Sequence, residues 1–84
     1  MRTADALQAI TRAMAPYVGD TMARASTLAH SRRLGIAEPS VEAAQLEALL
    51  QGLSNGLNVF VGKARSAEAV RTAWEALAAL GDGK

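Results

Sequence analysis

The sequence predicts an all-α fold: one domain over residues 1–84, built as a compact antiparallel bundle of four helices, or of five if the third helix breaks. Apolar residues recur at every third or fourth position along most of the chain, which is the spacing of one helix face. Alanine, the strongest helix former, supplies 19 of the 84 residues. The run Val59–Val61 favours a strand, but it is too short to form a sheet.

The first helix is expected over residues 4–15. Thr3 has the side chain of an N-cap, and Asp5 would lie in the first turn, where the helix dipole favours negative charge. The apolar face of this helix consists of Leu7, Ile10 and Met14. Pro16 is expected to end the helix, because its ring disfavours the helical conformation in the preceding residue.

The second helix is expected over residues 16–34. Its first residue is Pro16, or Asp20 if the helix begins after Gly19. The apolar face that we predict consists of Val18, Met22, Ala25, Leu28 and Ala29. Arg32 and Arg33 fall in the last turn, where positive charge is favourable, and Gly35 is expected to end the helix in the left-handed conformation.

The third helix is expected over residues 41–61, with Ser40 as its cap after a connector at residues 36–39. One continuous apolar stripe consists of Leu46, Leu49, Leu50, Leu53, Leu57 and Val61. The stripe favours a single helix, although Gly52 and Gly56 are each unfavourable by about 1 kcal/mol relative to Ala in a helix interior. A break near residue 55, giving two shorter helices, is the alternative.

The fourth helix is expected over residues 67–80. Ser66 is predicted to cap it, after a short basic turn at Gly62–Arg65, and Gly81 to end it. The apolar face consists of Val70, Ala73, Trp74, Leu77 and Ala78.

Composition argues against several classes of function. Nine basic and eight acidic residues give a net charge of +1, so neither a nucleic acid nor a membrane surface is the expected partner. The chain has no Cys and one His, which leaves no thiolate and no cluster of metal ligands. No run approaches the ~20 apolar residues that a membrane span needs, and the first residues lack the apolar core of a signal peptide. We therefore expect a cytoplasmic protein without metal or cofactor, and the many Ala, Gly and Arg residues suggest a bacterial source.

Catalytic motifs are also missing. The segment from Gly56 to Lys63 differs from a phosphate-binding loop. Five residues rather than four separate Gly56 from the Gly62–Lys63 pair, and Ala64 follows the pair where the loop has Ser or Thr. No two carboxylates are set in an apolar context, as acid–base catalysis would need, and no Gly-x-Ser-x-Gly turn is present. The sequence predicts neither an enzyme nor a small-molecule substrate.

Two alternative functions use side chains of the second helix. Arg24, Arg32 and Arg33 would form a basic face for a DNA-binding regulator, whose affinity would depend steeply on salt. His30 would be the phosphoacceptor of a histidine phosphotransfer bundle, with Arg33 as the basic residue close after it. Leu34 stands where such domains carry a small residue, and a surface histidine near a helix end is the simpler interpretation.

The stretch from Leu7 to Leu34 resembles the small helical domains appended to bacterial signalling proteins, including Ser/Thr kinases and forkhead-associated proteins. The resemblance covers a third of the chain and rests on the segment from Ala15 to Ala23, in which Pro, Tyr, Val and Gly lead into a helix rich in small residues. Asp20 departs from the apolar or Pro residue of that pattern. The resemblance implies a regulatory interaction module and transfers no catalytic residue.

We therefore predict a non-enzymatic interaction or adaptor module in bacterial signalling or regulation, which binds a protein partner or forms a homodimer. So small and alanine-rich a chain buries a thin core, and without disulfides it needs support from another chain. The predicted contact is an exposed apolar strip of Leu53, Leu57, Phe60, Val61 and Trp74, with Lys63 and Arg65 as its polar rim. Ala48, Gly52 and Gly56 recur every four residues, which permits close helix packing within one bundle or across a dimer.

Overall fold

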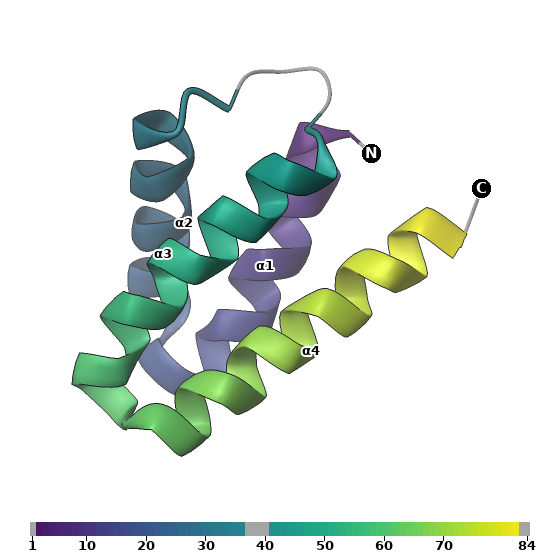
Figure 1. The fold of residues 1–84 in the computed structure, drawn as a ribbon. Coiled ribbons are helices and arrows are strands. Elements are labelled where there is room, and N and C mark those ends of the chain that lie inside the picture. The colour runs from purple at the N-terminus through teal and green to yellow at the C-terminus, as the bar shows by residue number, and fades with distance from the viewer. Residues whose placement is uncertain (1, 37–40, 83–84) are drawn as a thin grey trace.

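A computed structural model describes residues 2–36 and 41–82 of the chain, and the prediction of an all-α fold is confirmed (Figure 1). The four helices are α1 (Thr3–Val18), α2 (Asp20–Arg33), α3 (Ala43–Val61) and α4 (Lys63–Asp82). No strand occurs among these described residues. The radius of gyration is 11.7 Å, close to the ~12 Å expected of a compact chain of this length.

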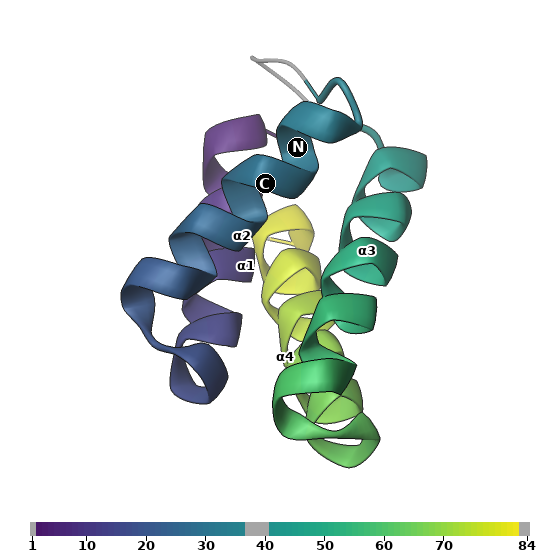
Figure 2. The ribbon, with the colours of Figure 1, turned by 90° about the vertical axis from the view of Figure 1, so that its left-hand side faces the viewer.

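The four helices pack around one core. α1 packs along both α2 and α4, and α3 packs along α4, whereas the contact between α2 and α3 is less extensive. Figures 1 and 2 show that the turn between α1 and α2 and the turn between α3 and α4 lie at the same end of the molecule. We call this the glycine end, because Gly19 and Gly62 form the two turns.

Each turn at the glycine end consists of a single residue. Gly19 and Gly62 have φ of +90° and +86°, and their N–H groups donate to the carbonyl oxygens of Ala15 and Asn58. Only glycine adopts this backbone conformation without steric cost, so these residues fix where α1 and α3 end. The third glycine turn is the one predicted at Gly35, where the paired bonds Gly35 N–H to Arg32 O and Ile36 N–H to Ser31 O close α2.

The predicted end of the first helix is wrong, because α1 continues through Pro16 to Val18. Proline removes one backbone hydrogen bond, the one that the carbonyl of Arg12 would accept. Both residues are exposed, and Pro16 lies in the last turn of α1, so the helix tolerates the loss of this one bond. The helix before Gly19 therefore includes Pro16, and α2 begins at Asp20. Thr3 is not the cap: it is the first helical residue and is buried, and Arg2 precedes it.

α3 runs without a break through Gly52 and Gly56, so the two-helix alternative for this segment is not observed. The helix begins at Ala43 with Glu42 as its N-cap. The Glu42 N–H donates to the side chain of Gln45 over 2.9 Å, and the Glu42 side chain accepts a backbone N–H in return. The predicted cap, Ser40, lies outside the described residues.

α4 begins at Lys63, so the predicted basic turn is the first turn of this helix and Ser66 is not its cap. Ser66 is fully buried where α4 crosses α3. Its hydroxyl donates to the carbonyl oxygen of Ser54 over 3.1 Å and also lies 3.1 Å from the Ser54 hydroxyl. A serine that appeared to be a helix cap is therefore a polar contact between two helices.

The predicted apolar face of α2 is also wrong. The buried residues of this helix are Ala23, Thr27 and Ser31, whereas Met22 and Leu28 are each 39 % exposed. Ala25 and Ala29 are exposed as well. On the other three helices the predicted apolar faces are buried or half-buried, except that Ala78 of α4 is exposed. α4 also continues past Gly81, its predicted end, to Asp82. The largest fully buried apolar side chains of the core are Ile10, Leu49, Leu50 and Leu77.

Candidate functional site

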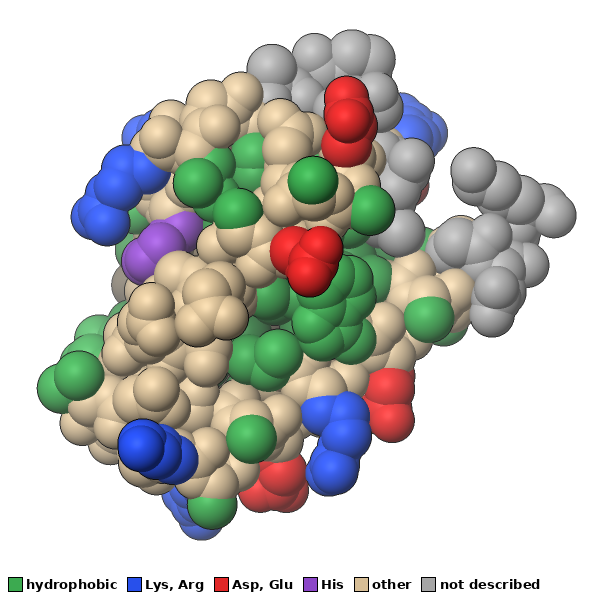
Figure 3. All heavy atoms as spheres, viewed as in Figure 1, with side chains coloured by type: hydrophobic (Ala, Val, Ile, Leu, Met, Phe, Trp, Pro, Cys, Tyr) green, Lys and Arg blue, Asp and Glu red, His purple; other side chains and the backbone are tan. Residues whose placement is uncertain are grey.

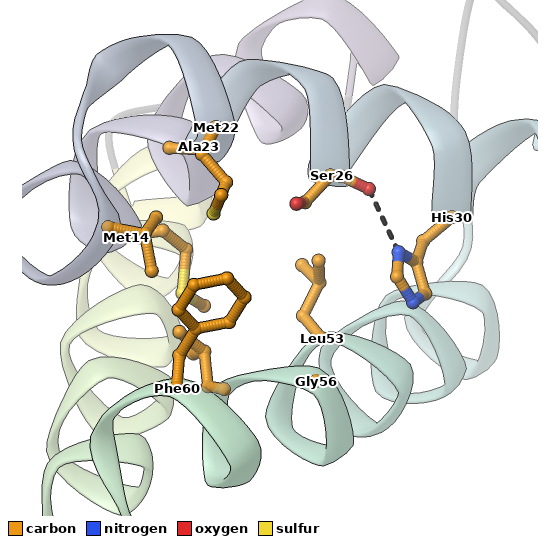
Figure 4. Close-up of a pocket in the computed structure, with 10 residues that line it drawn as sticks. Met14, Met22, Ala23, Ser26, His30, Leu53, Gly56 and Phe60 are labelled. Atoms are coloured by element: carbon orange, nitrogen blue, oxygen red, sulfur yellow. Dashed lines mark hydrogen bonds between the residues drawn. The ribbon is translucent and has the colours of Figure 1, made fainter.

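An apolar groove lies between α2 and α3 and extends from the glycine end toward the middle of the molecule (Figure 4). Its empty volume is about 410 Å³, part of which is open solvent. The groove occurs where α2 and α3 have their less extensive contact. The space enclosed within it is about 80 Å³, far below the volume of a pocket for a drug-sized ligand, so the groove can receive part of one protein side chain.

The floor of the groove belongs to the core. Met14 of α1 and Leu53 and Leu57 of α3 form it, and all three are almost fully buried. Leu53 and Leu57 were predicted to be part of an exposed strip, and the predicted exposure is wrong, because both side chains are buried where α3 packs against α4 and α2. Only the groove gives a partner access to these two side chains.

The rim of the groove carries large apolar side chains in contact with water. Phe60 of α3 is 65 % exposed, and Figure 4 shows it across the groove from Met22 of α2. Val59, next to Phe60, is 87 % exposed. The exposed position of Phe60 agrees with its predicted place in an apolar surface.

The far end of the groove is polar and is formed by His30 and Ser26. The Nδ1 atom of His30 lies 2.9 Å from the backbone oxygen of Ser26. A carbonyl oxygen only accepts, so Nδ1 carries the hydrogen and Nε2 is the acceptor of the neutral ring. The half-buried imidazole is therefore fixed in one orientation, with Nε2 toward α3 (Figure 4).

Two glycines of α3 shape this wall of the groove in different ways. A Cβ at Gly52 would lie 2.8 Å from Cδ2 of His30, so the absence of a side chain there gives the imidazole its place. A Cβ at Gly56 would have no atom within 4 Å. Of the small residues at this spacing, Gly52 serves packing within the protomer, whereas Gly56 and Ala48 are exposed.

The outer face of α3 toward the glycine end has no charged side chain. Its members are Gln51, Asn55, Gly56, Val59 and Phe60, all of them exposed. Glu47, the one charged residue of α3, is exposed one turn before Gln51 and lines the open groove beside Trp74. The other three helices each expose at least two charged residues.

The remaining predicted residues lie apart from the groove. Val61 is half-buried and packs against the core. Lys63 and Arg65 are exposed in the first turn of α4, at the glycine end. Trp74 is half-buried in a separate open groove between α3 and α4, near Leu50. Figure 3 shows hydrophobic side chains between these two helices in the middle of this face, and the histidine at its left edge.

Sequence reasoning identified only part of this wall. Val18 and Met22 belong to the predicted apolar face of the second helix and line the groove. Ser26 and His30 were left out of that face, although Met22, Ser26 and His30 follow one another at intervals of four residues, which places them on one side of a helix.

No group of three His, Cys, Asp or Glu side chains that could hold a metal ion occurs in residues 2–36 and 41–82. No helix in this part of the chain combines the length and the apolar character needed to cross a membrane.

Comparisons of the chain with family models, with curated proteins and with solved structures found no match.

Proposed function

We propose that this protein is a non-enzymatic, self-associating interaction module, and that a second copy of the chain covers the outer face of α3 and the groove beside it. The observation that carries the proposal is an open apolar groove with the exposed Phe60 at its rim, beside the exposed Val59, on the uncharged outer face of α3. The proposal includes the antiparallel order of the helices, a single domain over residues 1–84 and an adaptor role in bacterial cytoplasmic signalling.

The composition of this face is that of an interface. Protein interfaces are depleted of charge at their centre and enriched in Phe and Met, and contiguous exposed apolar surface marks a binding site. Phe60 and Met22 supply those side chains, and the nearest charged residues are on other helices or beside Trp74. Water contact of these groups is unfavourable by about 25 cal/mol for each Å² of apolar area.

A second copy is the occupant that best matches the charge of the face. In the described chain, the outer face of α3 is uncharged, whereas α1, α2 and α4 expose charged residues. A neutral face pairs with another neutral face without leaving a charge buried and unpaired. An arrangement of two copies about a two-fold axis brings this face against itself.

The available area predicts a weak dimer. A helix of 19 residues is about 28 Å long and about 10 Å wide, which gives roughly 280 Å² for each copy of α3. The α2 wall of the groove roughly doubles this, so the total is about 1,100 Å², at the lower end for specific interfaces. Association should therefore depend strongly on concentration.

Light scattering and sedimentation over a concentration series test this proposal. The wild-type protein should change from monomer to dimer between about 1 μM and 1 mM, the range of a weak interface. Phe60→Glu should remain monomeric, because it buries a charge at the centre of the contact. Leu28→Glu is the control: Leu28 is exposed on α2 outside the groove, so this variant should dimerise as the wild type does. A wild-type protein that stays monomeric throughout would contradict the proposal.

Neither alternative function is part of the proposal. Arg24 and Arg33 are nine positions apart, which places them on opposite sides of α2 at ~100° per residue, so the three arginines do not form one face. For phosphotransfer, Nε2 of His30 faces α3, 3.5 Å from the position that a Cβ of Gly52 would take.

A further inference from the structure

The groove contains enough detail to define how two copies meet, and this inference rests on the proposed function. We propose that two α3 helices cross antiparallel about a two-fold axis near Gly56, so that Phe60 of each copy fills the polar end of the groove of the other, against His30 and over Gly52. Each Phe60 ring is then shared between the two copies: it lines the glycine end of its own groove and covers the His30 end of the other.

Gly56 marks the point of closest approach. It is exposed on the outer face of α3, and the position of a Cβ there is free of contacts within 4 Å. No side chain of α3 therefore covers the groove at Gly56, which lies between the exposed ring of Phe60 and the His30 ring of α2. Helices approach one another most closely where neither has a side chain.

The spacing along α3 brings Phe60 to the right place. Gly52 and Phe60 are each four residues from Gly56, which is about 6 Å along the helix axis in opposite directions. In an antiparallel pair about a two-fold axis, positions at equal distances from the axis meet. Phe60 of the second copy therefore lies over Gly52, where only the imidazole of His30 occupies the space near the backbone.

The His30 end of the groove suits an aromatic ring. The imidazole is fixed by its bond to Ser26, and the apolar side chain of Leu53 lies between it and the resident Phe60 (Figure 4). A ring that enters beside the imidazole gains an edge-to-face or offset-stacked contact and covers Leu53. Phe60 is the only phenylalanine of the chain and, at 65 % exposure, is free to supply that ring.

Proton NMR tests the contact without an added label, because the chain has a single histidine and a single phenylalanine, whose signals can be assigned directly. The carbon-bound protons of His30 should shift progressively upfield as the protein concentration rises through the dimerisation range, since an aromatic ring shields protons above its face. Phe60→Leu keeps an apolar side chain but has no ring, so the concentration-dependent shift should be lost in this variant. A dimer whose His30 signals do not move with concentration would overturn the inference.

Disulfide cross-linking tests the two-fold axis, because the chain has no cysteine of its own. Gly56→Cys should form disulfide-linked dimers about tenfold faster than Val59→Cys. The two residues at position 56 meet at the two-fold axis, whereas the two residues at position 59 lie ~9 Å apart along the helix axes. Exposure alone predicts no preference for position 56, because Val59 is also exposed, at 87 %. Ala79→Cys, exposed near the end of α4, is the control for random collision.

The outcomes distinguish this inference from the proposed function. A wild-type protein that dimerises in light scattering, with Val59→Cys cross-linking as fast as Gly56→Cys, would overturn the two-fold arrangement and leave self-association intact. A wild-type protein without any dimer would overturn both. Dimerisation together with preferential cross-linking at position 56 supports both.

Discussion

α2 and α3 face each other across the groove, yet they use their residues in opposite ways. α3 buries five leucines and leaves a neutral face in water. α2 buries Ala23, Thr27 and Ser31, and leaves Met22 and Leu28 partly exposed. α2 therefore buries small and polar residues and leaves large apolar residues at its surface, with Met22 in the groove and Leu28 outside it.

The difference shows that the burial of a helix depends on its neighbours as well as on its own apolar residues. α3 packs along α4 and also contacts α2, so these two helices cover its wide stripe of leucines. α2 has its extensive contact with α1 alone, where small residues let two backbones approach closely. Its larger residues are left for the side that no other helix of the protomer fills.

The largest expected effect separates the leucines of the two helices. Leu49→Ala removes a fully buried side chain of α3 and should lower the free energy of unfolding by about 2–5 kcal/mol. Leu28→Ala on α2 should lower it by less than about 1 kcal/mol, because much of that side chain is already in water. Urea denaturation followed by circular dichroism, at concentrations where the protein is monomeric, measures both. Equal losses would contradict the contrast between the helices.

The next effect concerns the hydroxyl that joins α3 to α4. Ser66→Ala removes the donor to the Ser54 carbonyl at a fully buried position, so the free energy of unfolding should fall by about 1–3 kcal/mol. Thr72→Ala is the matched control: its hydroxyl donates to the carbonyl of Glu68 on the exposed surface of α4. That variant should lose almost nothing, because alanine favours the helix and water replaces the bond. A Ser66 variant as stable as the control would show that this hydrogen bond does not stabilise the contact between α3 and α4.

Much of the fold could be predicted from the sequence, because leucine spacing and glycine position are local signals. The stripe on α3 and the left-handed Gly35 follow directly from them. Pro16 and Ser66 misled the prediction, since a proline near a helix end is tolerated by solvent and a serine serves equally as a cap or as a contact between helices. The sequence alone does not show which of these roles a proline or a serine takes, because the role depends on the neighbouring helix.

The candidate site was predicted only in part, for a related reason. Phe60 was identified because a large apolar residue near a helix end stands out in an alanine-rich chain. Ser26 and His30 were not included, because polar residues on one side of α2 become a groove wall only when α3 presents glycine opposite them. Trp74 was assigned to the same strip by its size, and the packing of α4 places it elsewhere.

The two glycines of α3 give an effect of intermediate size. Gly56→Ala should raise the stability of the protomer by about 1 kcal/mol, because the added methyl group meets open space in a helix interior. Gly52→Ala should gain nothing or lose stability, since its methyl group displaces the His30 ring and with it the bond to Ser26. In a His30→Ala background the Gly52→Ala gain should reappear, and a double-mutant cycle measures this coupling. Identical effects of the two glycine substitutions would show that the imidazole does not rest on α3.

The smallest expected effect has the opposite sign and lies on α2. Thr27 is 1 % exposed, and its hydroxyl has no hydrogen-bond partner among the described residues. Thr27→Val keeps the shape of the side chain and removes the polar atom, so the free energy of unfolding should rise by about 0.5–1 kcal/mol. Thr21→Val, exposed in the first turn of α2, should change it very little. A loss of stability in Thr27→Val would mean that the hydroxyl bonds within the contact between α1 and α2, and that polar residues on this helix stabilise the packing as Ser66 does on α4.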